Sequence, residues 1–205
     1  RCVFPLGAME KPAVRAYLDE KGFAVQSRES ESMEVCFVEG DYRDFLRAER
    51  PELLQKTGGA YVNNAGQKLG VHKGVPFYTV GQRKGLGIAL GYPAYVVRLN
   101  AEKNTIVLGT EADLLVQAFF VEDFCMVDEA AFFASRQLLV RIRYHSQPVS
   151  CSVERLPDGR LLVRTAKDVS AVTPGQSAVF YEGRRLVAGA VIASQKGIGA
   201  YLVQP

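Results

Sequence analysis

The chain has 205 residues, of which 48% are hydrophobic and 23% charged, a composition that is ordinary for a globular protein, so we do not expect a disordered chain. It has no uncharged apolar run long enough to cross a bilayer and no leader of basic and then apolar residues, so we expect neither a membrane segment nor export. The net charge of +3 is too small to identify a nucleic-acid-binding protein. Residues 61–110 nevertheless hold six Lys or Arg against one Asp or Glu, so the middle of the chain is its basic part.

The N-terminal residues predict two short helices. Residues 10–22 place Pro12 in a first turn, repeat apolar side chains on one face, and end at Gly22, which can stop a helix. Residues 41–47 predict a second helix, which stops near Pro51.

Beyond Pro51 the pattern changes to short apolar runs rich in Val, Tyr, Phe and Ile, separated by turn signals. Two of these turns, at residues 156–160 and 181–185, have the composition of hairpin turns. Many short antiparallel strands at near-regular spacing favour a small closed barrel, because closure removes exposed sheet edges. The expected strands are residues 60–62, 77–80, 94–99, 105–108, 138–144, 150–156, 160–166, 177–181 and 186–192.

The predicted fold is therefore mainly β, with a short helical remnant, a small central β domain and a C-terminal antiparallel β-barrel. Domain boundaries are expected where the pattern changes, near residues 48–51 and 113–118. The expected domains are residues 1–48, 49–115 and 116–205.

The four cysteines, Cys2, Cys36, Cys125 and Cys151, are far apart in the sequence and include no CxxC pair. Neither a structural zinc site nor a redox dithiol has the spacing it needs, and neither histidine has an acidic or cysteine neighbour, so we expect no metal site. This cysteine usage fits a reducing compartment, and we expect a cytoplasmic protein with free, buried thiols.

A glycine-rich stretch at residues 85–91 matches a dinucleotide-binding loop only in part. The third glycine of that pattern would fall at Leu90, and no long helix follows whose N-terminus could hold a pyrophosphate. Arg83 and Lys84 stand among glycines, which lets cations and backbone amides approach a phosphate closely. A glycine-rich turn with solvated charges has the same composition, and the residues alone favour that simpler interpretation.

Residues 141–145 read Arg-Ile-Arg-Tyr-His, and a regular strand would place Arg141, Arg143 and His145 on one face. An arginine pair beside Tyr144 suits phosphate contact combined with base stacking. A barrel strand with a solvated outer face gives the same pattern, so the residues leave both interpretations open.

Cys36 lies in an alternating apolar segment, residues 33–38, shortly before the second expected helix. A cysteine in such a strand usually packs in the core. A nearby helix N-terminus can lower the pKa of a thiol and so favour the reactive thiolate, whereas carboxylates such as that of Glu34 oppose this shift. The residues therefore leave core packing and sulfur chemistry both open.

Five motifs follow one another over nearly the whole chain. They are Phe4-Pro-Leu-Gly, Ser32-Met-Glu-Val-Cys-Phe, Gly81-Gln-Arg-Lys-Gly-Leu-Gly, Arg143-Tyr144 and Thr173-Pro-Gly-Gln-Ser-Ala-Val-Phe-Tyr. Each motif is weak alone, but in this order they make the chain resemble the C-terminal part of the bacterial tRNA-specific 2-thiouridylases.

The resemblance implies an ATP-dependent tRNA-uridine 2-sulfurtransferase, which adenylates the C2 oxygen of the wobble uridine in tRNA and then replaces AMP with sulfur. It implies that Cys36 is the catalytic persulfide carrier, loaded by a sulfur-donor protein and resolved by a second cysteine. It also implies that Arg143, Tyr144 and Gln176 contact the tRNA.

The family's N-terminal nucleotide-binding domain, with its Ser-Gly-Gly-x-Asp-Ser loop and first catalytic cysteine, is not among these residues, and Cys2 does not match that cysteine. We therefore expect ATP and Mg to bind the missing domain, no cofactor to bind this fragment, and no thiolation by the fragment alone. The alternative function is a non-catalytic RNA-binding β-barrel module.

Overall fold

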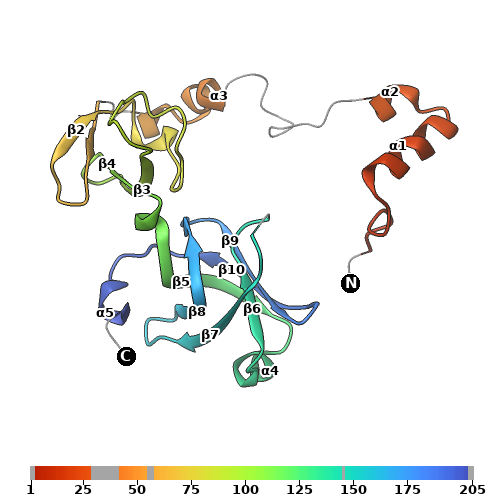
Figure 1. Ribbon diagram of the computed structural model, residues 1–205. Coiled ribbons are helices and arrows are strands. Elements are labelled where there is room, and N and C mark those ends of the chain that lie inside the picture. The colour runs from red at the N-terminus through yellow and green to blue at the C-terminus, as the bar shows by residue number, and fades with distance from the viewer. Residues whose placement is uncertain (1–2, 29–41, 55–57, 145, 203–205) are drawn as a thin grey trace. The chain divides into compact units, whose positions relative to one another are not determined.

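The computed structural model of this chain describes residues 3–28, 42–54, 58–144 and 146–202. The chain divides into two compact units, Arg1–Glu49 and Arg50–Pro205. The second unit holds a four-stranded sheet and a closed barrel, so the predicted mainly β fold is confirmed (Figure 1). Among the described helices, none has the length and apolar character needed to cross a membrane.

The first unit is helical where the structure describes it. The helix α1 ends where Gly22 takes a φ of +84°, a conformation that glycine adopts without strain, and Phe23 N–H donates to the Leu18 carbonyl at 2.9 Å. The two helices predicted at residues 10–22 and 41–47 are confirmed. The described helices of this unit are α1 Lys11–Glu20, α2 Ala24–Arg28 and α3 Tyr42–Glu49.

Most described side chains of the first unit are exposed. The helix α1 buries none of its residues. In α2, Ser27 is buried, and its hydroxyl donates to the Ala24 carbonyl at 3.0 Å and to the Asp19 carboxylate. The described part of this unit therefore has little core of its own. Its exposed large apolar side chains are Val3, Phe4, Leu6, Met9, Tyr17, Phe23, Val25 and Phe45.

A small mixed sheet begins the second unit, after the 3₁₀ turn η1 Pro51–Leu54. Its order is β2-β1-β4-β3, with β1 and β4 parallel and the other two pairings antiparallel. Tyr61, Val96, Ile106 and Leu108 are fully buried in it and supply its core. Its strands are β1 Ala60–Val62, β2 Lys68–Val71, β3 Tyr95–Asn100 and β4 Thr105–Gly109.

Residues 77–80 do not form the strand that the sequence predicted. The 3₁₀ turn η2 Val75–Phe77 occupies the start of this segment, and the residues after it run as a loop. The apolar side chains of the segment are nevertheless buried. Pro76 has no backbone N–H to donate to a neighbouring strand. The apolar composition of this segment therefore indicated burial correctly but did not indicate strand pairing.

A buried histidine packs in the core of the central sheet. His72 is 3% exposed, and its ring meets the rings of Tyr61 and Tyr78 edge to face at centroid distances of 5.4 and 5.8 Å. Its Nδ1 accepts a hydrogen bond from Gly74 N–H at 3.0 Å, while its Nε2 lies 3.3 Å from the Asn104 carbonyl. These partners fit a neutral ring protonated on Nε2. Burial holds the pKa of His72 below its ordinary value of 6.5.

We expect His72 to make the folded protein sensitive to acid. Because folding lowers the pKa of His72, the unfolded chain binds a proton near pH 6.5, whereas the folded chain binds it only at lower pH. The contribution of His72 to the free energy of unfolding is therefore complete above pH 6.5 and is lost as the pH falls below that value. Urea unfolding followed by circular dichroism from about pH 8 to about pH 5 should show this loss, and His72→Gln should flatten it. An unchanged pH dependence in the variant would contradict the assignment.

The predicted C-terminal antiparallel barrel is confirmed, with strands in the closed order β10-β5-β8-β7-β6-β9. Both predicted hairpin turns are present, because β8 follows β7 and β10 follows β9 as paired neighbours. The barrel strands are β5 Leu115–Met126, β6 Leu138–Arg141, β7 Val149–Arg155, β8 Leu161–Ser170, β9 Ser177–Glu182 and β10 Arg185–Ile192, and its flanking elements are η3 Ala112–Leu114, α4 Glu129–Ala134 and α5 Gly199–Leu202.

The longest strand, β5, was not predicted, because it is buried on both faces and shows no alternation at its centre. Phe119 and Val121 belong to the main barrel core. Ala118 and Phe120 point the other way, into a second apolar cluster completed by the segment after β10. A strand covered on both sides reads as a continuous apolar run, which the sequence alone does not distinguish from other buried segments.

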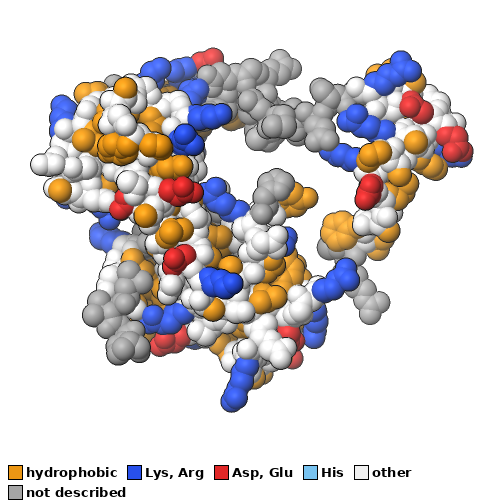
Figure 2. Space-filling view, in the orientation of Figure 1, with side chains coloured by type: hydrophobic (Ala, Val, Ile, Leu, Met, Phe, Trp, Pro, Cys, Tyr) orange, Lys and Arg blue, Asp and Glu red, His pale blue; other side chains and the backbone are white. Residues whose placement is uncertain are grey.

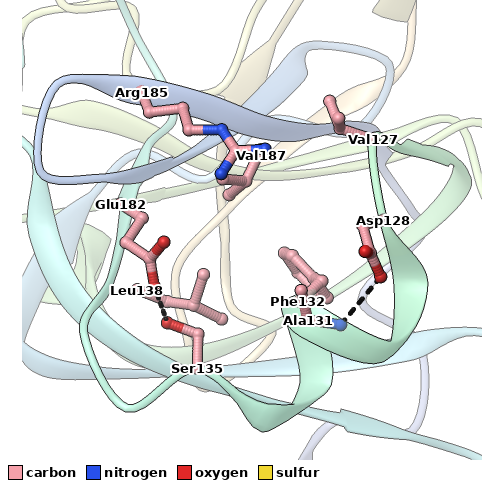
Figure 3. Close-up of a pocket in the computed structure, with 9 residues that line it drawn as sticks. All are labelled: Val127, Asp128, Ala131, Phe132, Ser135, Leu138, Glu182, Arg185 and Val187. Carbon is pink, nitrogen blue, oxygen red and sulfur yellow. Dashed lines mark hydrogen bonds between the residues drawn. The ribbon is translucent and has the colours of Figure 1, made fainter.

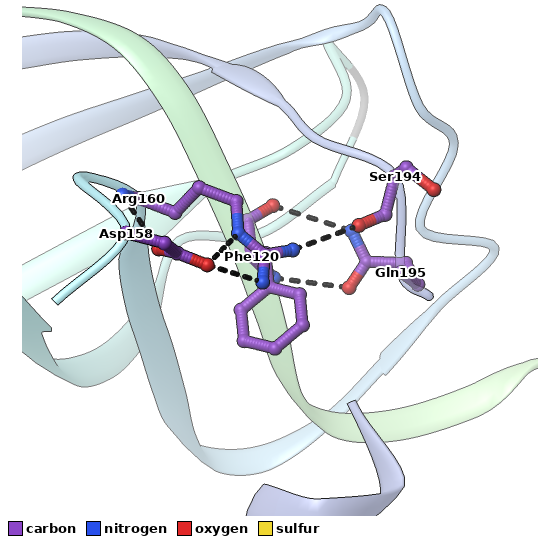
Figure 4. A network of polar contacts seen from close by, with 5 residues as sticks. All are labelled: Phe120, Asp158, Arg160, Ser194 and Gln195. Atoms are coloured by element: carbon purple, nitrogen blue, oxygen red, sulfur yellow. Dashed lines mark hydrogen bonds and ion pairs between the residues drawn. The ribbon is translucent and has the colours of Figure 1, made fainter. Parts of the chain in front are cut away.

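Polar contacts hold this second cluster together (Figure 4). The Gln195 side chain accepts from Phe120 N–H at 3.0 Å and donates to the Phe120 carbonyl at 3.2 Å. The Arg160 guanidinium lies 4.0 Å from the centre of the Phe120 ring and pairs with Asp158 at 2.7 Å. Gln195 therefore fixes the segment after β10 to the backbone of β5, while Arg160, from the turn before β8, covers the Phe120 ring and donates to the Ser194 carbonyl at 3.4 Å.

Candidate nucleic-acid interface

The glycine-rich loop of residues 81–87 is anchored to the central sheet at its start. Gly81 N–H donates to the Val96 carbonyl at 2.8 Å, and Val96 N–H donates to the Gln82 carbonyl at 2.9 Å. The Gln82 side chain accepts from Thr79 N–H at 3.1 Å and donates to the Lys84 carbonyl at 2.9 Å. The loop is thus folded back on itself by one glutamine.

The same loop is anchored again at its far end. Leu86 is buried, and its carbonyl accepts from the Tyr61 hydroxyl at 2.7 Å. Burial, together with the neighbouring Tyr78, raises the pKa of Tyr61 above its ordinary value, so this hydroxyl keeps its proton as a donor. Between the two anchors, Arg83 and Lys84 are exposed. The loop therefore presents two cations from a fixed backbone.

The basic character of the central sheet lies on its surface. All six Lys and Arg residues between residues 61 and 110 are exposed, and none forms an ion pair with a described residue. Figure 2 shows Lys and Arg side chains over this part of the protein. Unpaired surface cations leave a field that favours a polyanion. These residues are Lys68, Lys73, Arg83, Lys84, Arg98 and Lys103.

Arg143 does not lie on a regular strand, contrary to the prediction for residues 138–144. The strand β6 ends at Arg141, because the chain then turns: Ser146 N–H and its hydroxyl donate to the Arg143 carbonyl at 3.1 and 2.8 Å. The expected common face of Arg141, Arg143 and His145 is therefore wrong for the first two residues, and His145 lies outside the described residues.

The Arg143 guanidinium reaches acceptors from two parts of the second unit. Its Nη2 lies 3.3 Å from the Val80 carbonyl, just before the glycine-rich loop. The same nitrogen lies 3.1 Å from the Ala171 carbonyl and 3.2 Å from the Thr173 hydroxyl, both after β8. Sequence reasoning did not identify Val80, Ala171 or Thr173, although Thr173 opens one of the five motifs.

The other two expected RNA contacts are on the barrel surface. Tyr144 is 85% exposed. Gln176 is also exposed, and it closes the turn that Thr173 opens, with Gln176 N–H donating to the Thr173 carbonyl at 3.2 Å. The Thr173 hydroxyl is also a partner of Arg143, so the structure brings Arg143 next to the turn that carries Gln176.

A hollow of about 440 Å³ opens beside Arg143 at the end of the barrel. Most of its lining is apolar. The residues around it are Val140, Ile142, Arg143, Ser146, Gln147, Val149, Asp168, Val169 and Ser170.

A second hollow, between α4 and the β9–β10 hairpin, holds only about 30 Å³, enough for a water molecule and too little for a nucleotide (Figure 3). The described residues contain no group of three or more His, Cys, Asp or Glu side chains that could hold a metal ion.

Cys36, the expected sulfur carrier, lies outside the described residues, as does Cys2. The two described cysteines are free thiols, and they differ. Cys125 is exposed, so the prediction of a buried thiol is wrong for it. Cys151 is partly buried, and burial raises the pKa of its thiol to about 12.

These environments predict different thiol reactivities. At neutral pH, iodoacetamide should modify Cys125 at least about tenfold faster than Cys151, because the thiolate is the reactive form and Cys151 holds its proton. Peptide mass spectrometry after timed quenching measures both rates in one sample. Equal rates would contradict the burial of Cys151.

Three family models match the chain one after another. A model described as the tRNA methyl transferase HUP domain matches residues 1–40. The tRNA methyl transferase PRC-barrel domain matches residues 43–110, and the Aminomethyltransferase beta-barrel domain matches residues 116–192. The matches leave few residues uncovered.

Curated relatives match along the same length. The tRNA-specific 2-thiouridylase MnmA 3 of Bacteroides fragilis is 57% identical over 205 residues, which is 100% of this chain and 57% of the relative. The protein of that name from Phocaeicola vulgatus is 53% identical over 97% of this chain, and the MnmA of Chloroflexus aurantiacus is 43% identical over 94%; the match covers 53% of each relative. The chain thus spans little more than half the length of these relatives. With three consecutive domain matches and relatives of one kind along its whole length, it belongs to the tRNA-specific 2-thiouridylase (MnmA/TrmU) family.

Proposed function

We propose that this chain is the C-terminal part of an enzyme that uses ATP to replace the C2 oxygen of the wobble uridine in tRNA with sulfur. The observation that carries the proposal is the 57% identity to a tRNA-specific 2-thiouridylase over 100% of the chain. The exposed cations of the central sheet and the anchored loop that presents Arg83 and Lys84 support a polyanionic substrate. A tRNA substrate also implies that the protein works in the cytoplasm.

We propose three modules with the boundaries expected from the sequence. Residues 1–48 are the end of the catalytic domain, and the exposed apolar side chains of the described first unit support a larger domain that covers them. Residues 49–115 and 116–205 are the central β domain and the barrel, which together hold the tRNA. The HUP match over residues 1–40 supports a nucleotide-binding catalytic domain.

Cys36 carries the sulfur in this proposal. A donor protein transfers sulfane sulfur to the Cys36 thiolate, which gives a persulfide and a reduced thiol on the donor. The terminal sulfur of the persulfide attacks C2 of the adenylated uridine, and AMP leaves with the former C2 oxygen. The thiolate of a second cysteine, upstream of this chain, then attacks Cys36 Sγ, which forms a disulfide and leaves 2-thiouridine on the tRNA.

The nucleotide belongs to the part of the enzyme that precedes this chain. The proposed role of the described residues is to bind and orient the tRNA.

Filter binding of labelled tRNA by the 205-residue chain tests the RNA-binding half of the proposal. Affinity should fall steeply with salt, and the paired change Arg83→Ala and Lys84→Ala should lower the slope of log affinity against log salt by about 2, because each phosphate contact contributes about 0.9. Arg136→Ala, at an exposed cation of the barrel, is the matched control and should leave the slope unchanged. Absence of binding at low salt would overturn this part of the proposal.

A further inference from the structure

Arg143 uses one nitrogen to join two parts of the second unit. The two hydrogens of Nη2 face three acceptors, the Val80 carbonyl, the Ala171 carbonyl and the Thr173 hydroxyl, at 3.1 to 3.3 Å. The Thr173 hydroxyl itself donates to the Ala171 carbonyl at 2.9 Å, which leaves its oxygen free to accept. All three acceptors are neutral, so the contacts hold Arg143 in place without neutralising its charge.

The two parts approach each other closely at Gly81. A Cβ at this position would lie 2.8 Å from the Ala171 Cβ and 3.4 Å from Arg143 Nη2, and Gly81 also has a φ of +86°. Val80 and Ala171 form a buried apolar cluster with Leu114. The close approach therefore requires glycine, and the spacing between loop and barrel is fixed there by packing as well as by Arg143.

We propose that Arg143 is a positioning residue, which fixes the loop that presents Arg83 and Lys84 against the barrel end that carries Tyr144 and Gln176. This inference rests on the proposed tRNA-binding function and deepens it. A rigid junction lets one RNA meet both surfaces without the cost of ordering them on binding. Arg143 thus acts chiefly through the residues it holds in place, in addition to any contact of its own with RNA.

The chemistry of arginine explains why lysine does not serve here. A guanidinium nitrogen at the end of a planar fork reaches carbonyls from two segments at once, whereas an ammonium is a shorter-reaching point charge. Arg143→Lys therefore keeps the charge and loses the junction. The fold should survive this change, because the buried apolar cluster of Val80, Leu114 and Ala171 remains.

Hydrogen exchange of the 205-residue chain without RNA tests the junction by itself. Arg143→Lys should speed exchange at the amides of Gly81 and Gln82 by about tenfold or more, while Arg136→Lys should leave it unchanged. Gly81→Ala should have the same effect without touching a charge. Gly87→Ala is its control, because Gly87 also has a positive φ, of +67°, but a Cβ there would meet nothing within 4 Å. Unchanged exchange in both Arg143→Lys and Gly81→Ala would overturn the junction.

The tRNA affinities of paired variants test the positioning role. Lys84→Ala should weaken binding by about fivefold in the unmodified chain and by less than about twofold in the Arg143→Lys background. In that background the loop is displaced, so Lys84 no longer contacts the RNA that the barrel binds. Equal losses in the two backgrounds would overturn the positioning role. Absence of tRNA binding by the unmodified chain would overturn the RNA-binding part of the proposed function and the positioning role together, while the exchange result would still decide whether Arg143 forms the junction.

Discussion

Replacement of Cys36 by serine is expected to lower the formation of 2-thiouridine by at least about a thousandfold, because a hydroxyl cannot carry sulfane sulfur and the reaction loses its nucleophile. The experiment uses the protein together with its upstream sequence, supplied with ATP, Mg, a sulfur donor and tRNA. Nucleoside digestion followed by mass spectrometry measures the product. The tRNA affinity should stay within about twofold of the unmodified protein, because the cations that bind RNA are untouched.

Cys125→Ser is the matched control for this prediction. Cys125 is an exposed thiol on β5 and has no role in the proposed reaction, so its replacement should leave 2-thiouridine formation unchanged. Full activity in the Cys36→Ser variant would contradict the role of Cys36 as the sulfur carrier.

Phe180→Ala should lower the free energy of unfolding of the barrel by about 3 to 5 kcal/mol, the usual effect of removing a buried aromatic ring. Phe180 is 1% exposed, and its ring meets that of Phe132 edge to face at 5.3 Å. It lies on β9, which pairs with both β6 and β10, so the substitution would leave a cavity inside the closed barrel. Urea unfolding followed by far-ultraviolet circular dichroism measures the change.

Leu186→Ala provides the control, because Leu186 is a large apolar residue on the neighbouring strand β10 that is 53% exposed. Its replacement should cost less than about 1 kcal/mol, because most of its surface already meets water. Equal destabilisation by the two substitutions would show that Phe180 is not part of the barrel core.

Most of the β architecture was predictable because its signals are local. The hairpin turn at residues 156–160 contains Pro-Asp-Gly, and in the structure Leu156 N–H and Gly159 N–H bond across it to the Arg160 and Leu156 carbonyls at 2.9 and 3.1 Å. Strands with one solvated face alternate in sequence, so their period is visible. The strand β5 has two buried faces at its centre, and some of its partners on the second face, Ala193, Ile198 and Tyr201, come from the end of the chain.

The candidate interface was predictable only in part, for a chemical reason. The motif order identified Arg143, Tyr144 and Gln176 as positions of interest. The partners of Arg143 on the other side of the junction are backbone carbonyls, and any residue type at positions 80 and 171 supplies one. Contacts to backbone carbonyls do not require a particular residue type and so cannot be recognised in the sequence. The exception is Gly81, where only glycine fits, because a Cβ would collide with the Ala171 side chain.

Sulfur tracing through Cys36 tests the central claim most directly. The protein with its upstream sequence is loaded with isotopically labelled sulfane sulfur, freed of the donor, and then given tRNA, ATP and Mg in a single turnover. We predict that the label is first found on the Cys36 peptide, and that it leaves this peptide as labelled 2-thiouridine forms. Labelled 2-thiouridine without prior label on Cys36, or label that stays on Cys36 while no 2-thiouridine forms, would contradict the account.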